Sequence, residues 1–460
     1  MRKDKDSLGE VSIPDEALYS SGTVRGAENF RLIGRPLSAY PDFVVTTARV
    51  KKAAAIANNR AGGMTEEVAR AIAQACDEIA SGQHHANFIV AMAEGSGGTS
   101  TNMNFNEVIA NRAGQILGDE LGAFRKVHPN DHVNMSQSTN DVLPTAIKLT
   151  CVVAAEPLIA SASDLARAFR DKAETYRNAL RLGRTCMQAA QPMTYGQLFD
   201  GYASGIERAI ANVQKARDGL RTVPMGGTAI GTGLGAVPGY RDHIGPALSE
   251  EFGFDVSLPA DYFDAMQSAD AFARFSAELK ILSETLGKIA ADLVILGSGG
   301  NSGLGEIILP SVQPGSSIMA GKVNPVICMM VQQNAFIMHG YDATVSVAAL
   351  HGQMEINHFE PVIAHALFNA LELLTNGCQI FREKCIEGLA IDEDRSYDNL
   401  VRSHAMSSVF LRDLGYERVT ALVKDAAAKG IPLAENAVAH GLLTEAGIRA
   451  SLEQAAQGAT

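Results

Sequence analysis

Hydrophobic residues recur at spacings of three and four along one stretch in the middle of the chain. The positions are Phe272, Phe275, Leu279, Leu282, Leu286, Ile289 and Leu293. This is a heptad seam over three repeats, and no proline lies between Pro259 and Pro310. The pattern predicts a helix of about thirty residues.

Four other stretches are also poor in proline and rich in alanine and leucine, and each predicts a long helix. They cover about 145–180, 194–221, 326–348 and 361–386. Five long helices are typical of a helical bundle, so we expect a mostly α fold. The few β-favouring runs, such as 307–310, are short and do not alternate with helices. An open parallel sheet is therefore not expected.

Turn-forming residues interrupt the helical pattern at two places, 138–145 and 388–395. These boundaries predict three units. They are an N-terminal helical domain at 1–142, a central helical bundle domain at 143–392 and a small C-terminal helical domain at 393–460.

The charge and the start of the chain narrow the class of protein. With a formal net charge of -12 and no run of lysine and arginine, the chain is not expected to bind nucleic acid. Its first ten residues are rich in charged side chains, and no eighteen-residue apolar stretch follows. We therefore expect no secretory signal and no membrane association, and a cytoplasmic location.

Cysteine and histidine residues are spaced without the patterns that bind metals. The six cysteines contain no C-x-x-C pair, and the eleven histidines show no H-E-x-x-H spacing. Neither a disulfide framework nor a catalytic transition metal is predicted.

Three polar segments, at 95–113, 134–146 and 321–331, each run into a predicted helix. Free backbone N–H groups and the helix dipole favour an anion at a helix N-terminus. If the three segments converge, their hydroxyl and amide donors form a site that can bind a carboxylate without the help of an arginine. The alternative is that these residues are ordinary helix caps.

The caps predicted in these segments are specific. Asn104 and Glu107 fit a capping box, and Asp141 fits a cap for the next helix. Asn324 fits an N-cap with Pro325 at the first helical position. The glycine-rich segments do not have the spacing of a nucleotide-binding loop.

Together these segments resemble the aspartase/fumarase superfamily of lyases, and most closely its aspartate ammonia-lyases. The resemblance rests on "PGSSIMAGKVNP" at 314–325, "GTSTNMNFNEVIANRA" at 98–113, "HPNDHVNMSQSTND" at 128–141, "GRTCMQAAQPMTYGQ" at 183–197 and "GGTAIGTGL" at 226–234. It implies a three-domain, mostly α-helical subunit with a central five-helix bundle. It also implies a homotetramer whose active sites each combine segments of three subunits, with no cofactor.

The resemblance implies anti β-elimination from a small amino acid carboxylate, with Ser316 as the general base. The reaction passes through a dianionic enediolate, which hydrogen-bond donors must stabilise. The glycine-rich segment 297–306 would let the Ser316 loop close over the substrate. Lys322 is the second catalytic residue, as the counter-charge for the other carboxylate. The further substrate-binding residues implied by resemblance are Thr99, Ser138, Thr139, Asn140, Thr185, Cys186, Ser317, Asn324 and Met329.

Three positions depart from the family pattern. Cys186 stands where the family usually has His or Gln, Ala189 where Asp is common, and Met329 where Glu is usual. By resemblance, Cys186 and Met329 lie on the leaving-group side of the site. Either these are neutral changes, or the leaving group is not plain ammonia.

The default expectation is an aspartate ammonia-lyase that forms fumarate. Three alternatives remain open at this point. They are a lyase for an N-substituted or trimethylammonium amino acid of the ergothioneine type, a fumarate hydratase, and a non-catalytic structural homologue.

Overall fold

The computed structural model describes residues 1–31, 35–299 and 302–457. The chain divides into two compact units, each assembled from three separate stretches of sequence. Unit 1 comprises Met1–Ile159, Asn212–Lys280 and Ile337–Leu373, and unit 2 comprises Ala160–Ala211, Ile281–Phe336 and Leu374–Thr460. The three-domain boundaries expected from the sequence remain a prediction.

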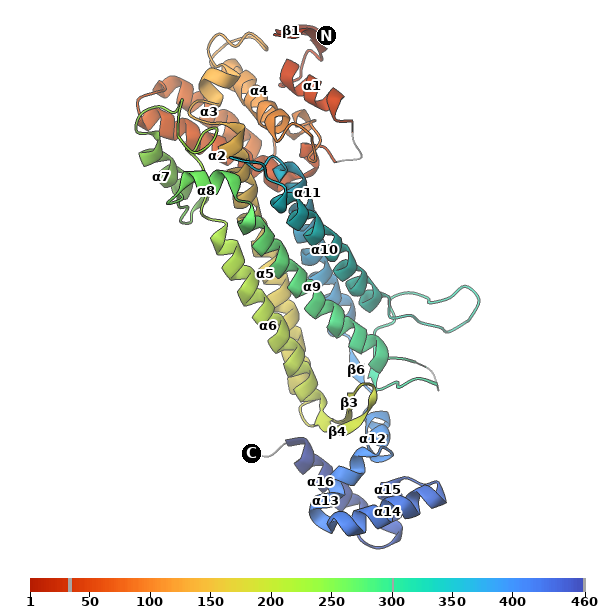
Figure 1. The fold of residues 1–460 in the computed structure, drawn as a ribbon. Coiled ribbons are helices and arrows are strands. Elements are labelled where there is room, and N and C mark those ends of the chain that lie inside the picture. Colours follow the sequence, from red (N-terminus) through yellow and green to blue (C-terminus); the bar gives the residue numbers. More distant parts are fainter. Residues whose placement is uncertain (32–34, 300–301, 458–460) are drawn as a thin grey trace. The chain divides into compact units, whose positions relative to one another are not determined.

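Five long helices dominate the fold (Figure 1). They are α5 (Thr139–Thr175), α6 (Tyr195–Gly219), α9 (Asp270–Leu296), α10 (Val326–Leu350) and α11 (Glu360–Phe381). All five coincide with the predicted stretches, and the mostly α fold is confirmed. Each of the seven apolar seam positions on α9 is buried, with at most 4% of the residue exposed.

Within unit 2, side-chain and backbone contacts link the five helices into a closed ring. The contacts are Arg170 of α5 with Asp200 and Glu207 of α6, Tyr202 of α6 with Asp292 of α9, Gly287 of α9 with Ala335 of α10, Asn334 of α10 with Gly377 of α11, and Phe381 of α11 with Phe169 of α5. Such a ring is the arrangement expected of a five-helix bundle.

Helix α5 starts about six residues earlier than predicted and contains Pro144 and Pro157. A proline inside a helix costs about 3 kcal/mol because it removes a hydrogen bond and crowds the preceding turn. Burial offsets this cost, since neighbours such as Leu143 and Ile147 are almost fully covered.

By length and composition, α5 is also the one helix among the described residues that could cross a membrane. Of its most apolar window, 72% is buried inside the protein, as in the core helix of a soluble protein. The helix is therefore weak evidence for a membrane span.

Unit 1 adds short helices and one hairpin to its parts of the long helices. Its own elements are β1 (Arg2–Asp6), β2 (Gly9–Ile13), α1 (Ser21–Asn29), α2 (Pro41–Arg60), α3 (Glu66–Ala80), α4 (Thr99–Ile116), α7 (Tyr240–Phe252) and α8 (Tyr262–Gln267), with single turns at Leu37–Ala39, His85–Asn87 and Pro129–Val133.

Unit 2 carries two small sheets and the C-terminal helices. Its own elements are β3 (Leu180–Thr185), β4 (Gln188–Thr194), β5 (Ile307–Ile308), β6 (Ala390–Ile391), α12 (Glu393–Val401), α13 (Ala405–Leu414), α14 (Tyr416–Lys429), α15 (Leu433–Ala439) and α16 (Glu445–Gln457), with one π-helical turn at Arg382–Ile386.

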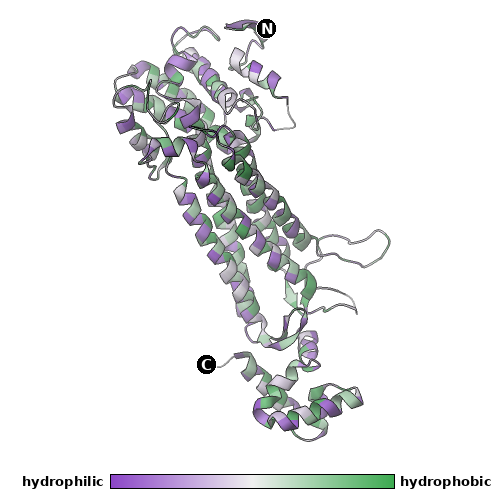
Figure 2. Cartoon of the chain, in the orientation of Figure 1, coloured by the Kyte–Doolittle hydropathy of each residue, from purple (hydrophilic) through white to green (hydrophobic). Residues whose placement is uncertain are grey.

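The sheets of the described residues are three antiparallel pairs, β1–β2, β3–β4 and β5–β6. This agrees with the expectation that the chain forms no open parallel sheet. The C-terminal helices share one hydrophobic core with Leu180 and Leu182 of β3. That core fixes the hairpin on which several candidate site residues stand. Figure 2 shows hydrophobic and hydrophilic positions along every long helix.

Candidate active site

Ser316 lies in the long loop between β5 and α10, which extends away from the helix ends (Figure 1). Its Oγ accepts hydrogen bonds from the backbone N–H groups of Ile318 at 3.1 Å and Met319 at 3.0 Å. N–H donors directed at a hydroxyl oxygen stabilise negative charge on that oxygen. Ser316 Oγ is thus a hydroxyl oxygen that accepts from two local N–H groups.

The two ends of the loop are held together. The N–H of Gly315 donates to the carbonyl of Lys322 at 2.8 Å, and the Asn324 side chain donates to the carbonyl of Gly315 at 2.8 Å. A Cβ atom on Gly315 would lie only 2.6 Å from the Lys322 carbonyl oxygen. Glycine is therefore required at this position, and the loop tip with Ser317 and Lys322 is exposed to solvent.

The predicted role of Asn324 as an N-cap is wrong. Helix α10 begins at Val326, and the Asn324 amide donates to Gly315 instead of accepting from the first turn. The reason is that the returning loop brings a carbonyl group within reach of Asn324. Pro325 stands one residue before the helix, although its carbonyl already accepts from Met329 N–H at 3.0 Å.

Thr185 and Cys186 stand at the tip of the β3–β4 hairpin. Thr185 ends β3, and Cys186 and Met187 form the two-residue turn, with φ of 51° and 62°. Two positive φ values are typical of a type I′ turn, which normally uses Asn-Gly. Non-glycine residues there cost roughly 1–3 kcal/mol each. The hairpin thus keeps a strained turn at a candidate substrate-binding position, where the Cys186 thiol is free and exposed.

Met329 lies in the first turn of α10 and is 45% exposed. Cys186 lines a cavity of about 340 Å³, and Met329 is not among the residues of its wall. Ala189, the third departure from the family pattern, is exposed on β4 and pairs with Arg184.

In unit 1, Thr99 is the first residue of α4. The preceding Gly98 has a φ of 92°, and a Cβ there would lie 2.1 Å from the Leu143 side chain and 3.2 Å from that of Thr139. The N-termini of α4 and α5 are therefore in close contact. Thr99 therefore lies beside Thr139, which Ser138 and Asn140 flank in the chain.

The predicted capping box at Asn104 and Glu107 is wrong because α4 starts five residues before Asn104. The Glu107 carboxylate instead caps α1. It accepts from the backbone N–H groups of Ser20 at 2.7 Å, Gly22 at 2.8 Å and Thr23 at 3.1 Å. Burial raises the pKa of Glu107, and these hydrogen bonds oppose that rise.

A capping box does exist at the start of α5, with Ser138 as its first member. Ser138 Oγ accepts from Asn140 N–H at 3.2 Å, and Asp141 Oδ1 accepts from Ser138 N–H at 2.8 Å. Asp141 is thus the third helical residue and not the cap predicted from the sequence. Its Oδ2 accepts from the N–H groups of Gly226 and Thr228, and burial raises the pKa of Asp141 to about 7.

Lys51 of α2 is a buried part of this group that sequence reasoning missed. Its Nζ donates to Asn102 Oδ1 at 2.7 Å and to Asn134 Oδ1 at 3.1 Å. The Asn102 amide in turn donates to Thr139 Oγ1 at 3.3 Å, which orients the threonine. Burial lowers the pKa of Lys51 to about 7, against the opposing charge of Asp141.

The candidate residues are divided between the two units of the chain. Unit 1 holds the group at the N-termini of α4 and α5, and its Asn140 amide donates to the Ala229 carbonyl at 2.8 Å. Unit 2 holds the Ser316 loop, the hairpin turn and Met329. The glycine-rich segment predicted to let the loop close includes Gly300 and Asn301, which lie outside the described residues. Within the described ranges, no group of three or more His, Cys, Asp or Glu side chains could hold a metal ion.

Known proteins resemble the chain over nearly its whole length. Residues 9–340 match a family model described as Lyase. The aspartate ammonia-lyase of Helicobacter pylori (strain J99) is 40% identical over 97% of this chain and 95% of its own length. The class II fumarate hydratase of Pseudomonas syringae pv. tomato is 36% identical over 96% of each.

A solved structure extends the similarity to the fold. The crystal structure of the fumarate lyase:delta crystallin from Brucella melitensis bound to cobalt has a TM-score of 0.96 and 38% identity, with all of both chains covered. The chain therefore belongs to this lyase family, the aspartase/fumarase superfamily.

Proposed function

We propose that the chain is a carbon–nitrogen lyase that removes an amine from a small amino acid carboxylate by anti β-elimination, with aspartate as the default substrate and fumarate as the product. The observation that carries this proposal is the pair of backbone N–H groups on Ser316 Oγ. A serine hydroxyl is too weakly acidic to serve as a base at neutral pH unless its alkoxide is stabilised. The relatives named aspartate ammonia-lyase support the choice of substrate.

In this mechanism Ser316 takes the proton from the carbon next to one carboxylate. The negative charge then spreads onto both oxygens of that carboxylate, and the bond to the amine on the neighbouring carbon breaks. We assign the binding of this carboxylate to Thr99, Ser138, Thr139 and Asn140, with Ser317 from the loop. The adjoining N-termini of α4 and α5 support this role, because the dipoles of both helices favour an anion at these ends.

The second carboxylate would bind Lys322, Asn324 and Thr185. Among the described residues, Lys322 has no ion pair and is exposed at the loop tip. Its charge is therefore available to a substrate. Closure of the loop over the substrate would exclude water and strengthen these charged interactions.

We further propose that the chain works as a homotetramer with active sites shared by three subunits. Helix α10 supports an assembly because it exposes large apolar side chains along its length: Met329, Phe336, Ile337, Val347 and Leu350 are each at least 45% exposed. An apolar helix surface of this kind normally packs against a partner. Light scattering should give four times the mass of one chain.

The cytoplasm remains the proposed location. All six cysteines are described as free thiols, which fits a reducing compartment.

The leaving group is proposed separately, because Cys186 and Met329 change the chemistry of its side of the site. An unsubstituted ammonium has three N–H donors that need acceptors. A thiol and a thioether accept only weakly, whereas methyl groups pack well against sulfur. An N-substituted or trimethylammonium amino acid of the ergothioneine type is therefore the second candidate substrate. The fumarate hydratase relative makes malate a third.

A substrate panel tests the proposal. Purified protein is given aspartate, N-methylaspartate, a trimethylammonium betaine and malate in turn, and the absorbance of the unsaturated acid is followed. Turnover of any amino acid supports a carbon–nitrogen lyase. Turnover of malate alone would show that the protein is a hydratase and not a carbon–nitrogen lyase. If no compound is turned over, a non-catalytic homologue is favoured.

A further inference from the structure

Unit 2 contains a cavity of about 340 Å³, and Cys186 is the one proposed substrate-binding residue in its wall. Its wall is formed by the β3–β4 hairpin, α6, α9 and Leu304. The polar side chains of the wall are Arg181, Arg184, Cys186, Tyr202, Lys288 and Asp292. No residue of the Ser316 loop belongs to it.

Arg181 is the unexplained group in this wall. The residue is 5% exposed and forms no ion pair with any acidic side chain among the described residues. Its Nη1 reaches only Met193 Sδ at 3.6 Å, and its Nε has no hydrogen-bond partner in that part of the chain. The guanidinium also stacks over the Tyr195 ring at 5.3 Å. Because arginine stays charged in proteins, a buried guanidinium without a counter-ion is unfavourable.

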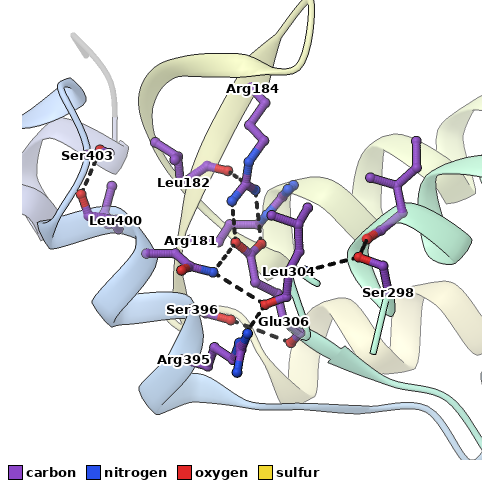
Figure 3. Close-up of polar contacts among 12 residues, drawn as sticks. Arg181, Leu182, Arg184, Ser298, Leu304, Glu306, Arg395, Ser396, Leu400 and Ser403 are labelled. Atoms are coloured by element: carbon purple, nitrogen blue, oxygen red, sulfur yellow. Dashed lines mark hydrogen bonds and ion pairs between the residues drawn. The ribbon is translucent and has the colours of Figure 1, made fainter. Parts of the chain in front are cut away.

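The acidic groups next to the cavity are already matched. Asp292 accepts from the Tyr202 hydroxyl at 2.8 Å and forms an ion pair with Lys288. Arg184 is paired with the buried Glu306 carboxylate (Figure 3). The charge of Arg181 is therefore not neutralised by any of these acidic groups, and the cavity is locally positive.

We propose that this cavity binds a small organic carboxylate, with its carboxylate on the Arg181 guanidinium and a short carbon chain against the apolar wall. A guanidinium fits a carboxylate in a planar, bidentate geometry. The remaining wall is hydrophobic, formed by Met187, Met193, Leu198, Ile295, Leu296 and Leu304. Such a wall can bury the carbon chain of an organic carboxylate, whereas an inorganic anion leaves the apolar side chains of the wall in contact with water.

Butyrate is the probe, because it has one carboxylate and cannot occupy both carboxylate sites of the proposed catalytic centre. Titration calorimetry on the whole protein at constant ionic strength gives its Kd. Cys186 supplies an independent readout, since it lines the cavity and is the one exposed cysteine of the six. At ten times the Kd, butyrate should slow alkylation of Cys186 by iodoacetamide about tenfold, because only about one site in eleven remains free.

Variants of Arg181 decide the assignment. Arg181→Met should weaken butyrate binding at least about tenfold and remove the protection of Cys186. Arg181→Lys keeps the positive charge, so it should retain part of the butyrate affinity and part of the protection of Cys186. The matched control is Arg412→Met, a change at an exposed arginine on α13, which should bind butyrate as the wild type does.

The proposal is overturned if wild-type protein shows no saturable binding of butyrate, or if Arg181→Met binds it unchanged. It is also overturned if sulfate at matched ionic strength protects Cys186 as well as butyrate does. If Arg181→Met does not fold, two measurements still test the proposal. They are the comparison of butyrate with sulfate on the wild type, and butyrate binding by Arg181→Lys. None of these measurements depends on turnover, so they are independent of the proposed function.

Discussion

Arg184 and Glu306 form a buried ion pair that joins the β3–β4 hairpin to the segment entering β5 (Figure 3). The Glu306 side chain is fully buried, and Arg184 Nη1 lies 3.1 Å from its Oε2. The amide of Asn399 on α12 donates to Oε1 at 2.9 Å. Since Thr185 follows Arg184 directly, this pair holds the hairpin next to its tip, where candidate site residues stand.

Glu306→Gln should destabilise the protein by about 3–5 kcal/mol, because it leaves the Arg184 guanidinium buried without its counter-ion. Urea denaturation followed by circular dichroism measures the change. The control is Arg274→Met in the exposed pair with Asp270, which should cost less than about 1 kcal/mol. Equal effects of the two substitutions would show that the Glu306 pair contributes no more to stability than an exposed pair does.

Lys51→Met should change how stability depends on pH. Burial lowers the pKa of Lys51 from 10.5 to about 7, so unfolding takes up a proton between these two pH values. Wild-type stability therefore gains from this group as the pH rises from 7 towards 10.5, by at most about 1.4 kcal/mol per pH unit. The variant lacks this gain.

The quantity to measure is the unfolding free energy of wild type minus that of Lys51→Met. It should be more positive at pH 9 than at pH 6. The matched control is Lys424→Met, at an exposed lysine on α14, measured at the same two pH values. A difference for Lys51→Met that does not vary with pH would mean that its amine titrates normally in the native protein.

Glu107→Ala should release the N-terminus of α1. The substitution removes the acceptor for three backbone N–H groups, at about 1–3 kcal/mol for each group that stays buried without a partner. Hydrogen exchange at residues 20–23 should accelerate, while exchange within α3 stays unchanged. The control is Glu66→Ala, at the exposed start of α3, which should leave exchange at 20–23 unchanged. Unchanged exchange at 20–23 in Glu107→Ala would refute the capping role of Glu107.

The double variant Cys186→His with Met329→Glu tests the proposed leaving-group preference. It restores strong acceptors, so kcat/KM for aspartate should rise relative to that for N-methylaspartate, by about tenfold for each hydrogen bond regained. Ala189→Asp, which restores the family residue at the third position that departs from the family pattern, is compared with the double variant by the same ratio of kcat/KM values. If the wild type already prefers aspartate strongly and does not act on alkylated compounds, neutral change explains Cys186 and Met329.

The long helices could be predicted because their signal is local. The seam from Phe272 to Leu293 repeats every three or four residues, and each of its positions proved buried. Helix ends were harder to place. Pro144 suggested a boundary, yet α5 begins at Thr139, because the packing of the surrounding apolar residues outweighs the cost of the proline.

The partners of single polar residues could not be predicted, because they depend on contacts between distant segments. Glu107 caps a helix more than eighty residues away, and Glu306 pairs with Arg184 across the fold. Lys51 stands beside Lys52 on an alanine-rich helix, and such a lysine is normally solvated. The turn at Cys186 was missed because its residues lack the Asn-Gly signal of a type I′ turn.

The central claim, that Ser316 is the general base, is tested most directly by the turnover of Ser316→Ala with the preferred substrate of the panel. The loop is exposed, so the variant should fold as the wild type does, by circular dichroism. Its kcat should fall by more than roughly a thousandfold, since loss of a catalytic acid or base commonly costs about 10² to 10⁴. Ser311→Ala, at an exposed serine earlier in the same loop, should keep wild-type turnover. Turnover of Ser316→Ala within about tenfold of wild type would contradict the account.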